Sequence, residues 1–342
     1  MKLNDRVISP KNAPLVIAEI GINHGGDLNV AKNMVKLAAE SGCECVKHQT
    51  HFVEDEMTEE AKSIFPPNSS NSIWDIMEEC ALSAEEEVAL KDYAESLGLI
   101  YLSTPFSRAA VDFLDDIGIA AFKIGSGEAD NLPLIRHIAG KGRPVIMSTG
   151  MQSIETLQES VAILEHAGIS YALNECTNLY PSPPEIVSLA GIKELQSSFP
   201  NAIIGFSDHS IGPTMALAAV ALGASIIERH FTDSRYRIGP DISCSMDPTE
   251  LRLLIDRSEE VFIATQNPKS RTKPEEAVYK FARASVVADR ELLQGHRVLE
   301  DDIWARRPGS GDIPGYDFDR VVGKVLKKSV KKNQQLSWND FE

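Results

Sequence analysis

Short apolar runs rich in Val, Ile and Ala recur along roughly the first 230 residues, separated by longer segments with helical periodicity. The apolar character of each run is nearly continuous rather than alternating, which is typical of strands that are covered on both faces. We predict eight such strands, at Leu15–Glu19, Cys43–Lys47, Leu99–Ser103, Ala120–Ile124, Pro144–Ser148, Ser170–Asn174, Ala202–Phe206 and Ser225–Arg229.

The segments between the strands carry helix start and stop signals. Asp27, Ser83 and Ser153 stand immediately before amphipathic runs, where their side chains can cap a helix N-terminus. Some of these runs end in glycine, as at Gly42 and Gly168. Strand and helix alternate eight times, and no GxGxxG motif follows the first strand. The pattern therefore favours an α/β protein with a (β/α)8 barrel, the TIM-barrel fold, over an open dinucleotide-binding sheet.

The pattern changes after the eighth strand. A last barrel helix is predicted at Asp247–Ile263, and the polar stretch QNPKSRTKPEE with its two prolines follows it. We therefore divide the chain into a barrel domain at 1–265, a linker at 266–282 and a small β-rich domain of short strands and turns at 283–342. The long connection Thr50–Leu82 is a candidate lid over the barrel mouth.

Composition and charge narrow the class of protein. Apolar residues make up 43% of the chain, which is enough for a sizeable core. The formal net charge of −16 argues against nucleic acid or an anionic membrane as the main partner. The five cysteines include no CxxC pair, which favours reduced thiols over a disulfide framework. There is no apolar run long enough to span a bilayer and no apolar signal-peptide core, so we expect a cytoplasmic protein.

Polar side chains stand at the C-terminal ends of all eight predicted strands, where barrels of this kind place their chemistry. The residues concerned are Glu19, Lys47, Gln49, Ser103, Thr104, Lys123, Ser126, Glu128, Ser148, Thr149, Thr177, Asn178, Tyr180, Ser207, His209 and His230. Two lysines are expensive to hold inside a barrel mouth without an anionic partner. Lys47 and Lys123, the hydroxyls nearby and the Gly-Ser-Gly-Glu turn at 125–128 therefore predict a phosphate or carboxylate site.

Two histidines suggest a metal site. His209 and His230 are one strand-plus-helix step apart, so both should lie at adjacent strand exits. Two imidazoles with open coordination positions suit Mn²⁺, Fe²⁺, Co²⁺ or Zn²⁺, and Asp241 is a further ligand or a base. Either histidine alone would more simply be an ordinary buried residue.

The stretch GFSDHS at 205–210 contains the three residue types of a hydrolytic triad. Successive residues of an extended segment point to opposite faces, so Ser207 and His209 share a face and Asp208 points away. With no GxSxG elbow present, the sequence argues against a serine hydrolase.

Eight motifs occur in an order and at spacings that resemble the sialic acid synthase family over nearly the whole chain. They are AEIGINHGG (18–26), KHQTH (47–51), STPF (103–106), KIGSGE (123–128), STGM (148–151), GFSDHS (205–210), IERHFT (227–232) and GPD (239–241). The segments ASVVA (284–288) and RRPGSGD (306–312) are similar to that family's small antifreeze-like (SAF) domain. KHQTHFVEDEM resembles the bacterial N-acetylneuraminate synthases in particular.

The resemblance implies a transferase that condenses phosphoenolpyruvate (PEP) with open-chain N-acetylmannosamine and water. The products would be N-acetylneuraminate and phosphate, formed by cleavage of the PEP C–O bond. It further implies a divalent metal, commonly Mn²⁺ with Mg²⁺ or Co²⁺ as alternatives, held by His209 and His230. Carried over residue by residue, the PEP-binding set is Lys47, Thr104, Lys123, Ser126, Ser148 and Ser207, with Glu19 handling protons. The sugar-binding set is Gln49, Asn68, Glu128, Asn178, Tyr180 and Asp241.

The resemblance also implies a homodimer in which the small domain is exchanged and caps the partner's barrel. Arg307 would then contact the sugar, and Phe281 in the linker would pack near the same site. Two positions depart from the family pattern: Glu175 stands where His is frequent, and Ser310 stands where Asn is usual.

Two alternatives stay open at this stage. One is the same chemistry on 2,4-diacetamido-2,4,6-trideoxymannose, yielding legionaminate, which would need a more apolar pocket. The other is a non-catalytic carbohydrate-binding or ice-binding protein built on the small domain, which would have no need of the barrel-mouth lysines and histidines.

Overall fold

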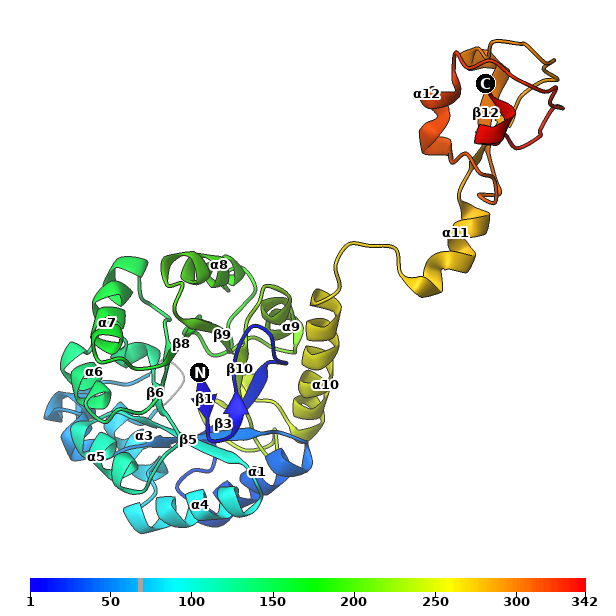
Figure 1. The fold of residues 1–342 in the computed structure, drawn as a ribbon. Helices are drawn as coiled ribbons and strands as arrows, with labels where there is room; N and C mark the ends of the chain where they lie inside the picture. The colour runs from blue at the N-terminus through cyan, green and yellow to red at the C-terminus, as the bar shows by residue number, and fades with distance from the viewer. Residues whose placement is uncertain (67–69) are drawn as a thin grey trace. The chain divides into compact units, whose positions relative to one another are not determined.

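The computed structural model describes residues 1–66 and 70–342, which divide into two compact units, Met1–Asn267 and Pro268–Glu342. In the first unit eight parallel strands close into a barrel surrounded by helices, as predicted (Figure 1). The strands are β3 (Leu15–Gly21), β4 (Cys45–Thr50), β5 (Ile100–Pro105), β6 (Phe122–Ile124), β7 (Val145–Ser148), β8 (Tyr171–Cys176), β9 (Ile203–Asp208) and β10 (Ile226–His230). β10 pairs with β3 and closes the ring.

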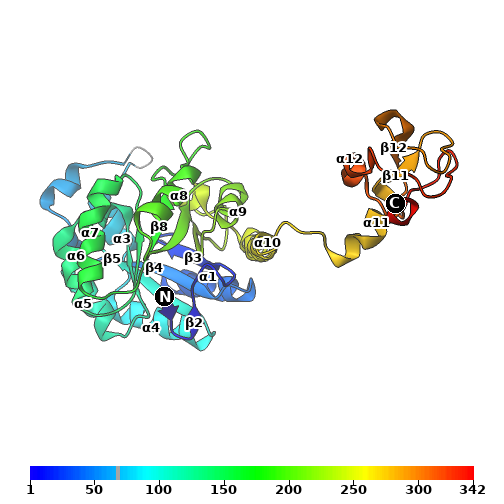
Figure 2. The same cartoon turned by 45° about the horizontal axis from the view of Figure 1, so that its top comes forward.

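The outer helices follow the strands in turn (Figure 2). They are α1 (Leu28–Glu40), α4 (Ala84–Ser96), α5 (Arg108–Asp116), α6 (Leu132–Ala139), α7 (Ile154–His166), α8 (Leu189–Ser198), α9 (Thr214–Ala221) and α10 (Pro248–Thr265). The predicted caps are confirmed: Asp27, Ser83 and Ser153 accept hydrogen bonds from the first turns of α1, α4 and α7. No helix in the described part of the chain has both the length and the apolar character to cross a membrane.

Six strands run further than predicted, ending at Gly21, Thr50, Pro105, Cys176, Asp208 and His230. β4 continues to Thr50 and β9 to Asp208, because their backbone ladders persist after the side chains become polar. Lys47 and Ser207 therefore lie within strands, where period-two alternation decides which face each side chain takes.

The barrel interior has an apolar bottom and a polar top. Leu15, Ile17, Cys45, Ile100, Leu102, Ala121, Ile146, Ala172 and Ile226 form the bottom layer. An N-terminal hairpin consists of β1 (Lys2–Leu3) and β2 (Arg6–Val7). Leu3 of β1 and Ile8, which follows β2, pack against this layer at the end where the barrel strands begin. Further along the strands, the inward positions are charged or polar.

The predicted lid segment folds into short helices: α2 (Val53–Glu56), η1 (Glu59–Ser63) and α3 (Ile73–Cys80). Ser72 caps α3 by accepting from Asp75 N at 3.1 Å. At the other end of α3, Gly26 adopts φ +76°, and a Cβ there would lie 2.3 Å from Glu79 O. Ser72 thus defines the start of α3, and Gly26 packs the end of α3 against the loop that follows β3.

The second unit contains α11 (Glu276–Ala282), β11 (Ser285–Ala288), β12 (Ile303–Arg306) and α12 (Phe318–Val321). β11 and β12 are antiparallel, and the unit has its own apolar core, which includes Val286, Ile303 and Leu326. α11 falls inside the stretch predicted as a polar linker, so that stretch is partly helical.

We predict that Gly205→Ala destabilises the barrel. A Cβ on Gly205 would lie 2.2 Å from Asn174 Oδ1 and 2.8 Å from Ile226 Cβ, so two neighbouring strands would have to move. Such overpacking costs roughly 1–3 kcal/mol, measurable by urea or thermal unfolding. Gly127→Ala is the matched control, because a Cβ there meets no described atom within 4 Å. Equal stability of Gly205→Ala and wild type would contradict the close packing.

Candidate active site

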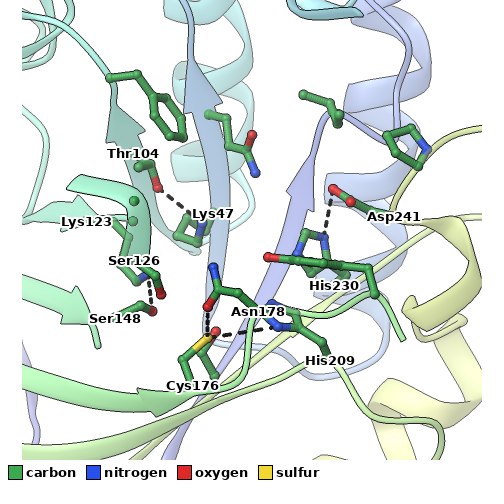
Figure 3. A pocket seen from close by; sticks show the side chains of 18 of the residues that line it. Lys47, Thr104, Lys123, Ser126, Ser148, Cys176, Asn178, His209, His230 and Asp241 are labelled. Atoms are coloured by element: carbon green, nitrogen blue, oxygen red, sulfur yellow. Dashed lines mark hydrogen bonds and ion pairs between the residues drawn. The ribbon is translucent and has the colours of Figure 1, made fainter. Parts of the chain in front are cut away.

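A cavity of about 340 Å³ opens at the carboxyl ends of the barrel strands. Figure 3 shows lysine and hydroxyl side chains along one side of it and His209, His230 and Asp241 along the other. Predicted site residues that line it are Lys47, Gln49, Thr104, Lys123, Ser126, Ser148, Asn178, Tyr180, Ser207, His209, His230 and Asp241. Lys47 and Asp241 are far apart in the sequence but line the same cavity, because the closed barrel brings the carboxyl ends of all its strands together.

The lysines are held by hydroxyls. Lys123 Nζ donates to Ser148 Oγ at 2.7 Å, and Lys47 Nζ donates to Thr104 Oγ1 at 3.2 Å (Figure 3). Ser126 Oγ accepts from the backbone N–H of Gly150 at 3.1 Å. Two buried ammonium groups and three hydroxyls thus face one small volume, which suits an anion with several oxygens.

Glu228 is a site residue that the sequence prediction missed. It lines the cavity, and its Oε1 lies 3.4 Å from Lys123 Nζ and 3.8 Å from Lys47 Nζ while accepting from Ser207 Oγ at 3.2 Å. Burial alone would raise the pKa of Glu228, but the two lysines outweigh it and lower the pKa to about 2. Glu228 lies two positions before His230, so both side chains take the inward face of β10. This spacing alone could have predicted Glu228 as a site residue.

Glu19 lies beneath the cavity rather than on its wall. Its carboxylate pairs with Lys47 Nζ and accepts from Gln49 Nε2 at 3.0 Å. Burial raises the pKa of Glu19 to about 7, with Glu228 adding repulsion and Lys47 opposing it. Burial alone would lower the pKa of Lys47, but attraction to the Glu19 and Glu228 carboxylates outweighs burial and raises it. Glu19 can therefore gain or lose a proton near neutral pH.

The two histidines lie side by side, with ring centroids 5.4 Å apart. Burial lowers the pKa of His209 to about 4 and that of His230 to about 3, so both imidazoles are neutral at pH 7. His209 Nδ1 lies 2.8 Å from the Thr177 carbonyl, to which it donates, leaving Nε2 with its lone pair. His230 Nδ1 lies 3.4 Å from Asp241 Oδ2.

The imidazoles of His209 and His230 meet one requirement of a divalent-metal site. Neutral imidazoles with a free ring nitrogen are what metal binding needs. Among the described residues, no group of three or more His, Cys, Asp or Glu side chains is placed to hold an ion. A metal here would be bound by two imidazoles, with water or substrate filling its other positions.

Asp208 has a structural role. Its side chain points away from the cavity, as predicted, and pairs with Arg229 at 3.3 Å while accepting from Ser210 N at 2.9 Å. Arg229 in turn donates to Ser210 O at 2.5 Å. Both side chains are buried, so this pair holds the turn after β9 next to β10.

The alternation along KHQTH separates two networks. Lys47 and Gln49 face the cavity, whereas His48 and Thr50 face outward. Thr50 Oγ1 donates to Glu87 Oε1 of α4 at 2.6 Å, and His48 Nδ1 lies 3.4 Å from the same oxygen. The outward residues therefore bind a helix to the barrel rather than a ligand.

Glu128, like Glu19, does not line the described cavity. Glu128 is half-buried beside it and accepts from Asn131 Nδ2 at 2.5 Å. Asn68 lies outside the described residues. Phe281 and Arg307 belong to the second unit, where Phe281 is exposed and Arg307 lines a shallow basic depression with Arg306 and Lys332.

Glu175 faces away from the barrel interior. A Cβ on Gly191 of α8 would lie 2.5 Å from Glu175 Oε2, so the carboxyl packs directly on the glycine backbone. The residue that follows Glu175 does enter the site: Cys176 Sγ lies 3.9 Å from His209 Nδ1 (Figure 3). The sequence prediction did not include Cys176.

A closed parallel barrel with buried cations, hydroxyls and paired imidazoles at its carboxyl end has the layout of a (β/α)8-barrel enzyme. The chain belongs to the NeuB family, which matches residues 34–270, and residues 283–342 match the SAF domain.

Named relatives are similar over nearly their whole length. The N,N'-diacetyllegionaminic acid synthase of Campylobacter jejuni is 34% identical, covering 94% of this chain and 98% of the relative. The N-acetylneuraminate-9-phosphate synthase of Homo sapiens is 33% identical, covering 97% and 93%. A crystal structure of the N-acetylneuraminic acid synthetase of Leptospira borgpetersenii, in complex with citrate, superposes with a TM-score of 0.75 at 29% identity, covering 81% of this chain and 94% of that one. The family's reaction is therefore synthesis of sialic acid or a related acid.

We predict that Glu175→Gln removes a pH-dependent loss of stability. Burial raises the pKa of Glu175 to about 7 from 4.5, so the folded protein holds this proton more tightly than the unfolded chain. The contribution of the protonated Glu175 carboxyl to the free energy of unfolding is fully present below pH 4.5. It is lost as the pH rises toward 7. The variant should be more stable than wild type at pH 8 by roughly 1–2 kcal/mol, and no more stable at pH 4.

Urea unfolding at the two pH values measures this difference. Glu159→Gln, on the exposed surface of α7, is the matched control, because Glu159 is not among the groups that shift the pKa of Glu175. A variant with the pH profile of wild type would contradict the burial of the Glu175 carboxyl.

Proposed function

We propose that the protein condenses PEP with open-chain N-acetylmannosamine and water to give N-acetylneuraminate and phosphate. One observation carries the proposal: buried lysines with hydroxyl partners and a pair of neutral imidazoles face the same cavity. An anionic donor and an aldehyde can thus be held next to each other, which a condensation requires.

In this proposal PEP occupies the lysine side of the cavity. Lys47 and Lys123 bind its phosphate and carboxylate, together with the hydroxyls of Thr104, Ser126, Ser148 and Ser207. Glu228 supports the proposal because it lies beside both ammonium groups: burial lowers the pKa of Lys123 and Glu228 opposes that shift, while Glu19 and Glu228 together raise the pKa of Lys47.

The sugar occupies the histidine side. Gln49, Asn178, Tyr180 and Asp241 line the cavity and orient it, with Glu128 and Asn68 as further candidates. His209 and His230 would hold a divalent metal, Mn²⁺ in the first instance, and this ion would supply Lewis acidity at the aldehyde oxygen. Neutral imidazoles support this assignment.

The bond changes balance as follows. C3 of PEP forms a bond to the aldehyde carbon, leaving cationic character at C2, and the aldehyde oxygen takes up a proton. Water adds at C2 and loses a proton, and the C2–O bond to phosphate breaks. Glu19 has the pKa of a group that can accept the proton from water, and it lies against Lys47 beneath the anion site.

The second unit enters the proposal through Arg307. We propose a homodimer in which this unit caps the partner's barrel, with Arg307 contacting the sugar and Phe281 packing nearby. The exposed state of Phe281 in the single chain is consistent with a contact made on assembly.

A second acceptor, 2,4-diacetamido-2,4,6-trideoxymannose, is favoured by apolar side chains that line part of the cavity, among them Ile73, Met77 and Phe106. A non-catalytic carbohydrate- or ice-binding role is disfavoured, because such a protein has no use for four buried charges in a barrel.

We predict that phosphate release from PEP requires the sugar, a divalent metal and His209. EDTA or His209→Ala should lower turnover by roughly 100-fold or more, because the developing alkoxide would lose its stabilisation. His166→Ala, at the exposed end of α7, is the control and should keep wild-type activity. Full activity in EDTA would contradict the metal, and no turnover with any aldose tested would favour a binding role.

We also predict complementation between two impaired proteins, assayed at a sugar concentration below the KM of Arg307→Ala. Arg307→Ala should raise KM for the sugar by roughly 10-fold or more, because a charged hydrogen bond is lost. Mixing it, after subunit exchange, with His209→Ala should restore part of the activity, since a hybrid dimer contains one intact barrel facing an intact cap. Native mass spectrometry of the mixture verifies that hybrids form. Hybrids without recovered activity would contradict the exchange.

A further inference from the structure

His51 is a buried histidine beside the cavity that does not itself line it. It stands two residues after Gln49, just past the end of β4. Its ring stacks on Phe106, with the ring centroids 4.6 Å apart and an angle of 10° between the planes. Phe106 is a cavity residue, so the imidazole cannot turn without disturbing the cavity surface. Stacking and burial therefore hold the ring of His51 in one orientation.

Both ring nitrogens of His51 face an oxygen atom. Nδ1 lies 2.8 Å from Oε2 of Glu56, the last residue of α2, and Nε2 lies 3.2 Å from Oε1 of Gln49. An ionised carboxylate only accepts hydrogen bonds, so Nδ1 carries a hydrogen and donates it to Glu56. Whether Nε2 also carries a hydrogen depends on which way the Gln49 amide is turned.

Glu19 determines the orientation of that amide. Lys47 Nζ pairs with Glu19 Oε2, and Glu19 Oε1 accepts from Gln49 Nε2 at 3.0 Å. The amide nitrogen is thus turned toward Glu19 and the amide oxygen toward His51. Since an amide oxygen cannot donate, Nε2 of His51 must carry a hydrogen as well. With both of its ring nitrogens donating, His51 is an imidazolium, and its counter-ion is Glu56.

The charged groups around this pair are compatible with a positive charge on His51. The Glu56 side chain is only 12% exposed, so water screens the pair weakly. Glu128 lies near Glu56, and burial, with Glu56 adding repulsion, raises the pKa of Glu128. His24 is neutral, because burial lowers its pKa to about 3. The ammonium group of Lys47 is balanced by the two buried carboxylates of the site.

We infer that His51 is a positioning residue: as an imidazolium held by Glu56, it turns the Gln49 amide so that its nitrogen faces the Glu19 carboxylate. The inference rests on the proposed function, in which Glu19 accepts the proton from water and Gln49 orients the sugar. Without the hydrogen on Nε2, a ring lone pair would face the amide oxygen and the amide would turn over. The amide oxygen would then lie against the carboxylate, which repels it. The predicted lid segment thus acts on the site through hydrogen bonds that run from α2 to β3.

Nitrogen NMR of the full chain with isotope-labelled histidine tests the charge directly. At about pH 7.5 an imidazole in water is mainly neutral. We expect a histidine whose two ring nitrogens both have the chemical shifts of an imidazolium, and this signal should be missing from His51→Phe. In Glu56→Gln the signal should change to that of a neutral imidazole, because the balancing carboxylate is gone. Glu54→Gln, at an exposed position of the same helix, is the matched control and should leave the signal unchanged.

Enzyme kinetics test the effect of His51 on the site. His51→Phe keeps a ring against Phe106 but cannot donate, so kcat should fall roughly 10-fold or more. The KM for PEP should stay the same, because the lysine and hydroxyl contacts are not changed. In a Gln49→Met background the same substitution should change kcat by less than about 2-fold, since the residue through which His51 acts is already absent. Thermal unfolding verifies that each variant is folded.

The outcomes separate this inference from the proposed function. A neutral His51 in the wild-type protein, or an equal loss of kcat in both backgrounds, would overturn the inference and leave the condensation intact. An imidazolium signal from His51 in a protein that releases no phosphate from PEP with any acceptor would instead overturn the proposed function.

Discussion

The structure of the barrel mouth depends on four buried charged side chains that neutralise one another, because bulk water does not solvate them. Lys47, Lys123, Glu19 and Glu228 are all buried, and each would cost several kcal/mol if it lost its partners. They come from β4, β6, β3 and β10, so the balance exists only when the ring of strands is closed. Glu228 bridges the two lysines across the interior. A bound anion would enter a site whose cations are already desolvated and oriented, which is how preorganisation strengthens binding.

This balance also divides the carboxylates by role. Glu228, next to two ammonium groups, stays ionised, whereas Glu19 has its pKa raised to about 7 by burial. Two carboxyls on the neighbouring strands β3 and β10 thus differ in proton affinity, because Glu228 has two lysine neighbours and Glu19 chiefly one. The imidazoles are kept neutral by burial, as metal ligation would need. The cavity therefore has a side with the buried cations Lys47 and Lys123 and a side with neutral imidazoles. Apolar side chains such as Ile73 and Phe106 also line it.

Much of this arrangement could be predicted from local pattern. The eight strands, the caps at Asp27, Ser83 and Ser153, and the outward direction of Asp208 follow from periodicity and from single side chains, and the structure confirms them. The position of the lysines and histidines at the mouth was predictable, because polar residues that follow an apolar barrel strand lie at its carboxyl end. The functional assignments of Asn68, Phe281 and Arg307 rested on resemblance alone and stay predictions.

What the sequence by itself determined is the fold class, the apolar bottom of the barrel and the identity of the residues at its top. Only the tertiary structure decided which of them meet. Glu228 reads locally as one more strand residue, and its importance appears when closure places it between Lys47 and Lys123. Glu175 departs from the family pattern, and only the structure shows that it packs on Gly191 of α8, away from the barrel interior. The segment Thr50–Leu82 was predicted only as a candidate lid, and the structure shows that Ile73, Ile76 and Met77 of its helix α3 line the cavity. The reason is physical: periodicity sets the face a side chain takes, but the curvature of the barrel and the packing of α3 set what lies opposite that face.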